Sequence, residues 1–419
     1  METTGTPEAV TELGSGHPGD DPNPPATARG GFVYVMSNQE TGNSVTVFAR
    51  DIYGGLTRKG TYPTGGLGIG RSYDLEDASD PLVSQGSLII SADKRFLFGV
   101  DAGSNEVSSL AIEGDRLRPV SRVPSGGLRP VSLTVHGNLL YVANSADASI
   151  AGFTVGDDGV LTPVDGSRQY LSGGPDSAPS QITFTPDGTQ LVATERQLNA
   201  LDVFPVDAYG RAGAPVRNDS HGPAPFSATF HGDFLLVTEI VGGHNFLGSM
   251  STYRVNRDGT LQVISGSVDT TEATTCWTAN STLDPTVIYA ASAQSGTISG
   301  YRIDATGRLT LFPPDGHLAT SRDQHATQDM AISEDGLYLY VIVAGFDEKI
   351  ADPRLPNYAE NTPYSNKMSI GAWRIEAAGG LTPLRGFGVQ DDPPRVVSTG
   401  ILAPSMGGLA PGSEGLVAI

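Results

Sequence analysis

The sequence predicts an all-β fold, a seven-bladed β-propeller built from four-stranded blades. Gly (53) and Pro (29) together make up about a fifth of the 419 residues, a composition that suits a large all-β domain with many turns. One turn motif recurs seven times along the chain. The C-terminal segment also resembles an internal segment of the repeat, which predicts that the two ends of the chain complete one blade.

The recurring turn joins a strand that carries a large apolar residue to a strand that starts near a leucine. Each copy contains a glycine, and successive marker glycines are 59, 45, 51, 49, 48 and 73 residues apart. A unit of about 45–50 residues has the length of a four-stranded propeller blade. The marker glycines are Gly55, Gly114, Gly159, Gly210, Gly259, Gly307 and Gly380.

The strands of each unit can be assigned from residue type. Before the marker turn lies a strand with one large residue in register, and we expect these residues to fill the wedge between neighbouring blades. Upstream lies a strand of β-branched and aromatic residues such as Val33–Met36, and before it a tight turn such as Pro186–Gly188 follows a short innermost strand. The large residues are Phe48, Leu110, Phe153, Phe204, Tyr253, Tyr301 and Trp373.

The first unit lacks an innermost strand, because its pattern starts at Gly31 with the second strand. At the other end of the chain, Ala403–Ile419 aligns with Ala178–Thr194, a stretch that contains an innermost strand. We therefore expect one propeller domain over residues 31–419, closed by the C-terminal segment, and a disordered tail over residues 1–30. An open array of β-sandwiches would leave the terminal match unexplained.

Charge and composition narrow the range of partners. The formal net charge of −20 argues against a nucleic-acid partner, because phosphate binding needs clustered Lys and Arg. No apolar run approaches the length of a membrane span, so we expect no membrane partner. We expect a cytoplasmic monomer that binds a small molecule, with secretion (the signal absent or removed) as the alternative location.

The longest insertions fall on one face of the predicted ring. Residues 63–83 lead into an innermost strand, whereas residues 241–248 and 345–367 follow second strands, and both kinds of junction lie at the same end of a blade. Binding residues are often carried on loops of a rigid scaffold. We therefore expect a ligand at the mouth of the central channel on this face. Surface drift is the alternative, but it would scatter insertions over both faces.

Polar and aromatic residues at the starts of the innermost strands predict a small polar organic ligand at that mouth. For Trp277 the alternative is core packing, for the sole cysteine, Cys276, a buried apolar role, and for His325 a surface loop. The expected ligand-binding residues are Gln85, Ser87, Ser132, Ser180, Gln181, Phe226, Ser227, Cys276, Trp277, His325, Gln328, Ser405 and Met406.

Three charged residues at the same mouth are candidates for the chemistry. Glu195 and Glu239 follow second strands of adjacent blades, and a desolvated carboxylate can transfer protons near neutral pH. Arg129 could stabilise developing negative charge or bind a carboxylate. The alternatives are carboxylates that hold loops and a salt bridge from Arg129 to either glutamate. The seven histidines have no metal-ligand spacing, so we expect neither a metal nor another cofactor.

These motifs resemble the seven-bladed lactonase family, which groups 6-phosphogluconolactonase-like proteins with fungal 3-carboxy-cis,cis-muconate cyclases. The resemblance extends over Gly31–Ile419 and is carried by segments such as Gln181–Gly188 and Gly296–Arg302. It implies the opening or closing of a lactone without metal. Catalytic members have His-Pro-His in the third blade and Gly-Pro-Arg-His in the fourth, where this chain has Arg129-Pro-Val and Ala-Pro-Ser-Gln181. The glutamate after the second strand matches as Glu195.

The sequence therefore predicts a lactonase-like or cyclase-like enzyme that acts on a lactone or related cyclic carboxylated molecule in the central channel. Glu195 would transfer the proton, with Glu239 as a second candidate, and Arg129 would stabilise negative charge. The alternative is a non-catalytic propeller that recognises a small ligand or a protein on the insertion-bearing face. The departures from the family's His and Arg positions favour this alternative, whereas Glu195 favours the enzyme.

Overall fold

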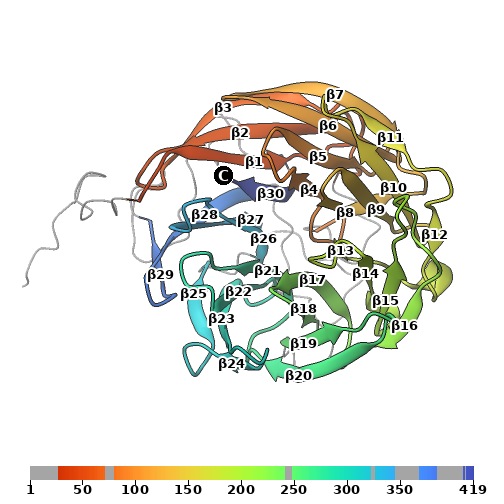
Figure 1. The fold of residues 1–419 in the computed structure, drawn as a ribbon. Coiled ribbons are helices and arrows are strands. Elements are labelled where there is room, and N and C mark those ends of the chain that lie inside the picture. Colours follow the sequence, from red (N-terminus) through yellow and green to blue (C-terminus); the bar gives the residue numbers. More distant parts are fainter. Residues whose placement is uncertain are drawn as a thin grey trace, which may run out of the picture.

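The computed structural model describes residues 27–70, 80–240, 248–321, 326–344, 368–384, 409–410 and 412–419. Its strands form seven antiparallel sheets arranged as blades around a central channel (Figure 1). This arrangement confirms the predicted seven-bladed propeller. Residues 1–26 of the expected tail lie outside the described residues, so the domain boundary at residue 31 stays a prediction.

The innermost strand of each blade runs beside the channel, and the second strand pairs with its outer edge (Figure 1). From blade one to blade seven, the innermost strands are β30 (Glu414–Ala418), β4 (Leu88–Ile90), β8 (Pro130–His136), β13 (Ile182–Phe184), β17 (Pro225–His231), β21 (Thr275–Asn280) and β26 (Ala326–Ile332). The second strands are β1 (Gly31–Met36), β5 (Phe96–Asp101), β9 (Leu139–Asn144), β14 (Gln190–Glu195), β18 (Phe234–Glu239), β22 (Val287–Ser292) and β27 (Tyr338–Ala344).

The third and outer strands complete the blades toward the rim. The third strands are β2 (Ser44–Arg50), β6 (Glu106–Glu113), β10 (Ser149–Val155), β15 (Ala200–Pro205), β19 (Ser249–Val255), β23 (Thr297–Ile303) and β28 (Met368–Ile375). The outer strands are β3 (Leu56–Pro63), β7 (Arg116–Pro124), β11 (Leu161–Pro163), β16 (Val216–Asp219), β20 (Leu261–Asp269), β24 (Leu309–Leu311) and β29 (Leu381–Pro383). Two short strands, β12 (Gln169–Tyr170) and β25 (His317–Thr320), extend blades three and six, and two 3₁₀ helices, η1 (Gly174–Asp176) and η2 (Arg196–Leu198), lie in blade four.

The residues expected between the blades are buried. All seven large third-strand residues, from Phe48 to Trp373, are at most 2% exposed. The turn after them needs glycine, as Gly159 illustrates: its φ is +83°, and a Cβ there would lie 2.3 Å from the Phe96 ring of the neighbouring blade. Because Gly54 and Gly379 take this positive φ, they replace Gly55 and Gly380 as the turn glycines of blades one and seven.

The ring closes where β30 pairs with β1. Val35 lies opposite Leu416 and Val33 opposite Ala418, so the C-terminal strand supplies the missing innermost strand of blade one. The alignment with Ala178–Thr194 put this strand too early, because it matched the final residues to a second strand. That place is already taken by β1, and the last residues can pair only with its free inner edge. Ser405 and Met406 lie outside the described residues.

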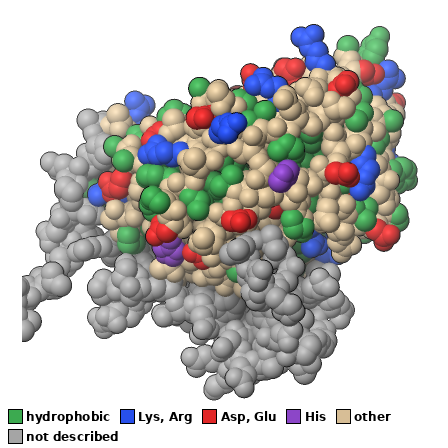
Figure 2. Space-filling model, turned by 90° about the horizontal axis from the view of Figure 1, so that it is seen from below, with side chains coloured by type: hydrophobic (Ala, Val, Ile, Leu, Met, Phe, Trp, Pro, Cys, Tyr) green, Lys and Arg blue, Asp and Glu red, His purple; other side chains and the backbone are tan. Residues whose placement is uncertain are grey.

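The outer surface has no dominant side-chain type on the side that Figure 2 shows. Acidic, basic and apolar side chains are interspersed there (Figure 2). Within the described ranges, no helix is long and apolar enough to cross a membrane.

Closure of the ring should depend on Leu416. This side chain is 5% exposed and belongs to an apolar cluster that includes Val35 and Tyr340, so Leu416→Ala should lower the free energy of unfolding by about 2–4 kcal/mol. Urea denaturation measures the change. The control is Val160→Ala at a 41% exposed position, expected to change stability by less than about 0.5 kcal/mol. Equal effects of the two substitutions would contradict closure by this strand.

Candidate functional site

A plug of cross-ring contacts fills the channel at the starts of the innermost strands. Gln85 of blade two reaches Thr278 of blade six, where its Nε2 donates to the Thr278 carbonyl at 2.9 Å and its Oε1 accepts from the Thr278 amide at 3.0 Å. The Trp277 indole donates to the Ser84 carbonyl at 2.9 Å and meets the Phe226 ring edge-on at 5.2 Å. The hydrogen bonds of Gln85 and Trp277 join blades two and six, which are not neighbours in the ring.

Most residues expected to bind the ligand are part of this packed layer. Each of the described ones is at most 9% exposed, and some hold the plug together, as when Ser132 Oγ donates to the Gln85 carbonyl at 2.7 Å. Cys276 is buried and forms no disulfide, in line with the apolar role that was its alternative. His325, Ser405 and Met406 lie outside the described residues. The buried members are Gln85, Ser87, Ser132, Ser180, Gln181, Phe226, Ser227, Cys276, Trp277 and Gln328.

Glu195, the predicted proton-transfer residue, holds the connection that enters blade four. Its carboxylate is fully buried and accepts from Ser172 Oγ and Ser177 Oγ, each at 2.7 Å, and from the Gly173 amide at 3.1 Å. A Cβ on Gly173 would lie 2.2 Å from Glu195 Oε2, so only glycine permits this approach. These contacts match the loop-holding alternative.

The same anchor recurs in other blades. Glu239, the second predicted carboxylate, accepts from the Gly222 amide at 3.1 Å and from the hydroxyls of Ser249 and Ser251. Asp101 in blade two likewise accepts from Thr64 Oγ1 at 2.6 Å. An acid at the end of a second strand therefore fastens the connection between blades, and its recurrence has a structural cause.

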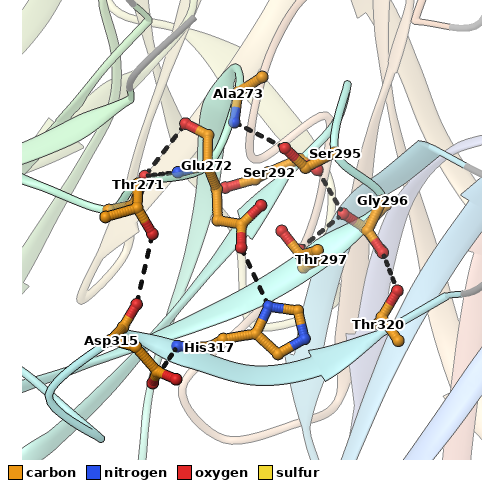
Figure 3. A network of polar contacts seen from close by, with 12 residues as sticks. Thr271, Glu272, Ala273, Ser292, Ser295, Gly296, Thr297, Asp315, His317 and Thr320 are labelled. Atoms are coloured by element: carbon orange, nitrogen blue, oxygen red, sulfur yellow. Dashed lines mark hydrogen bonds and ion pairs between the residues drawn. The ribbon is translucent and has the colours of Figure 1, made fainter.

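Blade six uses a different anchor, which Figure 3 shows. Here the acid lies in the connection itself, where Glu272 Oε1 is 3.0 Å from Nδ1 of His317 on β25. Thr271 Oγ1 donates to the Asp315 carbonyl, and Asp315 Oδ1 accepts from the His317 amide. The pair ties the connection to the outer edge of the blade (Figure 3). It is partly exposed at the rim and lies apart from the channel.

Blade four departs from the repeat by adding a second carboxyl group. Asp202 takes the third-strand position that Ser251 holds in blade five, and burial, together with the charge of Glu195, raises its pKa to about 7. Ser172 Oγ lies 2.7 Å from Glu195 Oε1 and 2.8 Å from Asp202 Oδ1. One hydroxyl has one proton to donate, so the second short contact favours a proton on Asp202, the carboxyl group whose pKa is raised.

Below the plug, the channel contains a cavity of about 400 Å³. It is lined by residues of β4, β8, β13, β26 and β30, with Gln85, Gln181 and Asp329 among them. Exposure rises along these strands, from Ser132, which is buried, to Val135, which is half-buried. The cavity therefore opens on the face of the tight turns, opposite the insertions. Of the described residues predicted to bind ligand, Gln85 and Gln181 line it.

Asp329 is a carboxyl group in the cavity wall with a pKa near neutral pH. It is 6% exposed, and its Oδ2 accepts from the Leu416 amide at 3.1 Å while its Oδ1 accepts from the Met330 amide at 2.9 Å. Burial raises the pKa of Asp329 to about 7, although these two hydrogen bonds act to lower it. A carboxyl group with such a pKa exchanges protons readily near neutral pH.

Arg129 lies in an acidic neighbourhood beside the plug. Its Nη2 donates to the Pro81 carbonyl at 2.8 Å. Burial lowers the pKa of Arg129, although the negative charges of Glu414 and Asp80 act to raise it. Glu414 Oε1 accepts from the Leu82 amide at 2.9 Å, and burial, followed by the charge of Asp80, raises the Glu414 pKa well above its usual value. The expected alternative for Arg129, an ion pair with Glu195 or Glu239, is wrong: the ion pair of Glu195 is with Arg217 at 3.6 Å.

Sequence reasoning missed Asp329 and Glu414. Asp329 directly follows Gln328, which was selected, and it is the one acid among the seven innermost-strand starts that the repeat defines. A single acid among starts that otherwise carry none was the available signal. Glu414 had no such signal, because the terminal alignment placed its strand too early. Within the described ranges, no group of three or more His, Cys, Asp or Glu side chains could hold a metal ion.

Comparison with known proteins identifies the kind of propeller. Residues 26–174 match the family model described as "Lactonase, 7-bladed beta-propeller". The resemblance to the seven-bladed lactonase family is confirmed. The 6-phosphogluconolactonase of Yersinia pestis is 28% identical over 103 residues, which is 25% of this chain and 29% of that protein. The sequence match to curated lactonases thus spans less than a third of their length.

Solved structures of other proteins share the fold over most of this chain. The periplasmic gluconolactonase of Pseudomonas aeruginosa is 16% identical, with a TM-score of 0.58 over 88% of this chain and 98% of its own. A protein of Lactobacillus plantarum is also 16% identical, with a TM-score of 0.60 over 88% of this chain and 97% of its own. At these identities the likeness shows the fold alone.

The raised pKa of Asp202 should make the stability of this propeller depend on pH. The Asp202 pKa of about 7 lies above that of an unfolded aspartate, about 3.9, so the folded protein binds the proton more tightly. Stability should therefore fall as pH rises from about 4 to about 7, by at most about 1.4 kcal/mol per pH unit from this group. Asp202→Ser, which restores the serine of blade five, should remove that part of the fall.

Urea denaturation at pH 5, 6, 7 and 8 measures the difference between wild type and Asp202→Ser. The matched control is Asp176→Ser, because Asp176 is an exposed aspartate of η1 in the same connection, and its loss should leave the pH slope as in wild type. Parallel curves for wild type and Asp202→Ser would show that the pair holds no extra proton.

Proposed function

We propose that this protein hydrolyses a lactone in the central cavity, with Asp329 as the general base. The observation that carries the proposal is a nearly buried carboxyl group on the wall of a cavity of small-molecule size. The match of residues 26–174 to the family model "Lactonase, 7-bladed beta-propeller" supports the reaction type. The raised pKa of Asp329 supports its role, since a base with a pKa near the working pH is effective.

In the proposed reaction, Asp329 takes a proton from a water molecule as the water oxygen attacks the lactone carbonyl carbon. The tetrahedral intermediate collapses by breaking the bond between the acyl carbon and the ring oxygen. The leaving alkoxide takes up the proton that Asp329 received, which restores the base. Lactone and water thus become one hydroxycarboxylic acid, and no other reactant is needed.

Gln181 is placed to stabilise the negative charge that develops on the carbonyl oxygen. Its Oε1 accepts from the Ala228 amide at 2.7 Å, which fixes the orientation of the side-chain amide. The NH₂ group at the other end can only donate, and Gln181 lines the cavity together with Asp329. A donor held rigidly before the reaction stabilises an oxyanion more than one that must reorient.

The residues selected from sequence have other roles in this proposal. Glu195 and Glu239 anchor connections between blades. Arg129 lies beside Glu414 and Asp80, where we propose that its charge balances the acids behind Asp329. The sequence hypothesis, in which Glu195 transfers the proton and Arg129 stabilises the product charge, predicts a different sensitive variant, so the two assignments can be separated.

The test compares kcat/KM for hydrolysis of six-membered lactones by wild type and Asp329→Asn as a function of pH. For wild type, kcat/KM should rise as pH increases through about 7, because the base acts when deprotonated. In Asp329→Asn this rise should vanish, and kcat/KM should fall by about 10²–10⁴-fold.

The matched control is Asp202→Asn, because Asp202 is also buried and also has a pKa of about 7 but does not line the cavity. This variant should keep the rise in kcat/KM. Loss of the rise in Glu195→Gln, with Asp329→Asn active, would return the proton-transfer role to Glu195. Lactone binding without turnover by wild type would instead support the binding-propeller alternative.

A further inference from the structure

We infer that the cavity selects an uncharged lactone with a short alkyl substituent over phosphorylated or polyhydroxylated sugar lactones. This inference rests on the proposed function and names the substrate class of the same site. It depends on three properties of the cavity wall: its charge, the polar groups left for a ligand, and the side chains near its opening.

The charge of the wall disfavours an anionic substrate. Among the described residues, Asp329 is the one charged side chain that lines the cavity. Arg129, the nearby cation, donates to the Pro81 carbonyl and lies beside Glu414 and Asp80. A phosphate or carboxylate in the cavity would therefore be desolvated without a cation to neutralise it. The net charge of −20 adds long-range repulsion of anions.

Few polar side-chain groups remain for the hydroxyls of a sugar. Both ends of the Gln85 amide are used by Thr278, and Thr134 Oγ1 already accepts from the Phe184 amide at 3.1 Å. The proposed reaction uses the NH₂ group of Gln181. Hydroxyl groups that lose water without gaining partners weaken binding strongly. A polyhydroxylated ring is thus a poor match for this wall.

Apolar side chains surround the outer part of the cavity. Ile89 and Ile90 of β4 and Val135 of β8 line it and are half-buried, so they present apolar surface to a ligand. A substituent directed from the ring toward the opening would cover them. The volume of about 400 Å³ has room for a six-membered lactone ring that carries such a substituent. Each methylene group that becomes buried should strengthen binding by about fourfold.

The experiment measures wild-type kcat/KM for three lactones with the same six-membered ring. These are δ-octalactone, which carries a propyl group, glucono-δ-lactone and 6-phosphoglucono-δ-lactone. We expect kcat/KM for δ-octalactone to exceed that for either sugar lactone by about tenfold or more. Binding of the same three compounds is measured in parallel by calorimetry with Asp329→Asn, which should bind without turnover.

The matched variants place a cation inside and outside the cavity. Ile90→Lys adds a positive charge to the wall. It should therefore lower kcat/KM for δ-octalactone and raise kcat/KM for the phosphorylated lactone. Ile52→Lys adds the same charge at a 41% exposed position in the rim turn of blade one and should change neither value.

The outcomes separate this inference from the proposed function. Faster turnover of either sugar lactone overturns the substrate class and leaves lactone hydrolysis in place. Binding of δ-octalactone that is lost in Ile90→Lys, without turnover of any lactone by wild type, supports the ligand class and overturns hydrolysis. If wild type neither binds nor hydrolyses δ-octalactone, the inference is overturned.

Discussion

The pairing of β30 with β1 is the constraint on which the rest of this propeller depends. It joins the last residues of the chain to the first described strand and leaves no open edge in blade one. The same strand orients the candidate site, because the Leu416 amide donates to Asp329 of blade seven. Residues 416–418 also form part of the cavity wall. Ring closure and construction of the site are therefore one event.

The plug adds a second constraint by separating the two faces of the channel. Its hydrogen bonds run from blade two to blade six, so they can form only when the ring is complete. Within the plug, Gln85, Ser132 and Trp277 hydrogen-bond to partners on other blades. Below it, the inner ends of the strands leave a cavity in which Asp329 is the one charged wall residue among those the structure describes. Water that reaches this carboxyl group would enter from the face of the tight turns.

Acidic residues that recur in several blades have structural roles, whereas those found in one blade are candidates for the chemistry. Asp101, Glu195 and Glu239 end second strands and fasten the connections between blades. A role repeated in several blades is explained by the blade. Asp202 and Asp329 break the repeat, and burial raises the pKa of each to about 7. Asp202 belongs to a loop anchor, whereas Asp329 lines the cavity, and this difference in position is the reason why we propose Asp329 for the chemistry.

The fold was predictable because each blade repeats local signals. The turn glycines and the buried third-strand residues depend on neighbours close in sequence, so their spacing revealed seven blades. The site was less predictable because its contacts cross the ring. Gln85 and Thr278 are 193 residues apart, and no local pattern indicates that they meet and close the channel. Glu195 was selected because it recurs, which in this structure reflects its anchoring role.

The central claim is that Asp329 is a carboxyl group near its titration midpoint at neutral pH and in contact with ligand. The direct measurement is ¹³C NMR titration of aspartate carboxyl groups in Asp202→Asn, with Asp329→Asn added to assign the signal. The account predicts a resonance that titrates near pH 7, disappears with Asp329→Asn and shifts when a non-hydrolysed δ-lactam is added. A carboxyl group that titrates near pH 4, or one that the lactam leaves unchanged, would contradict the account.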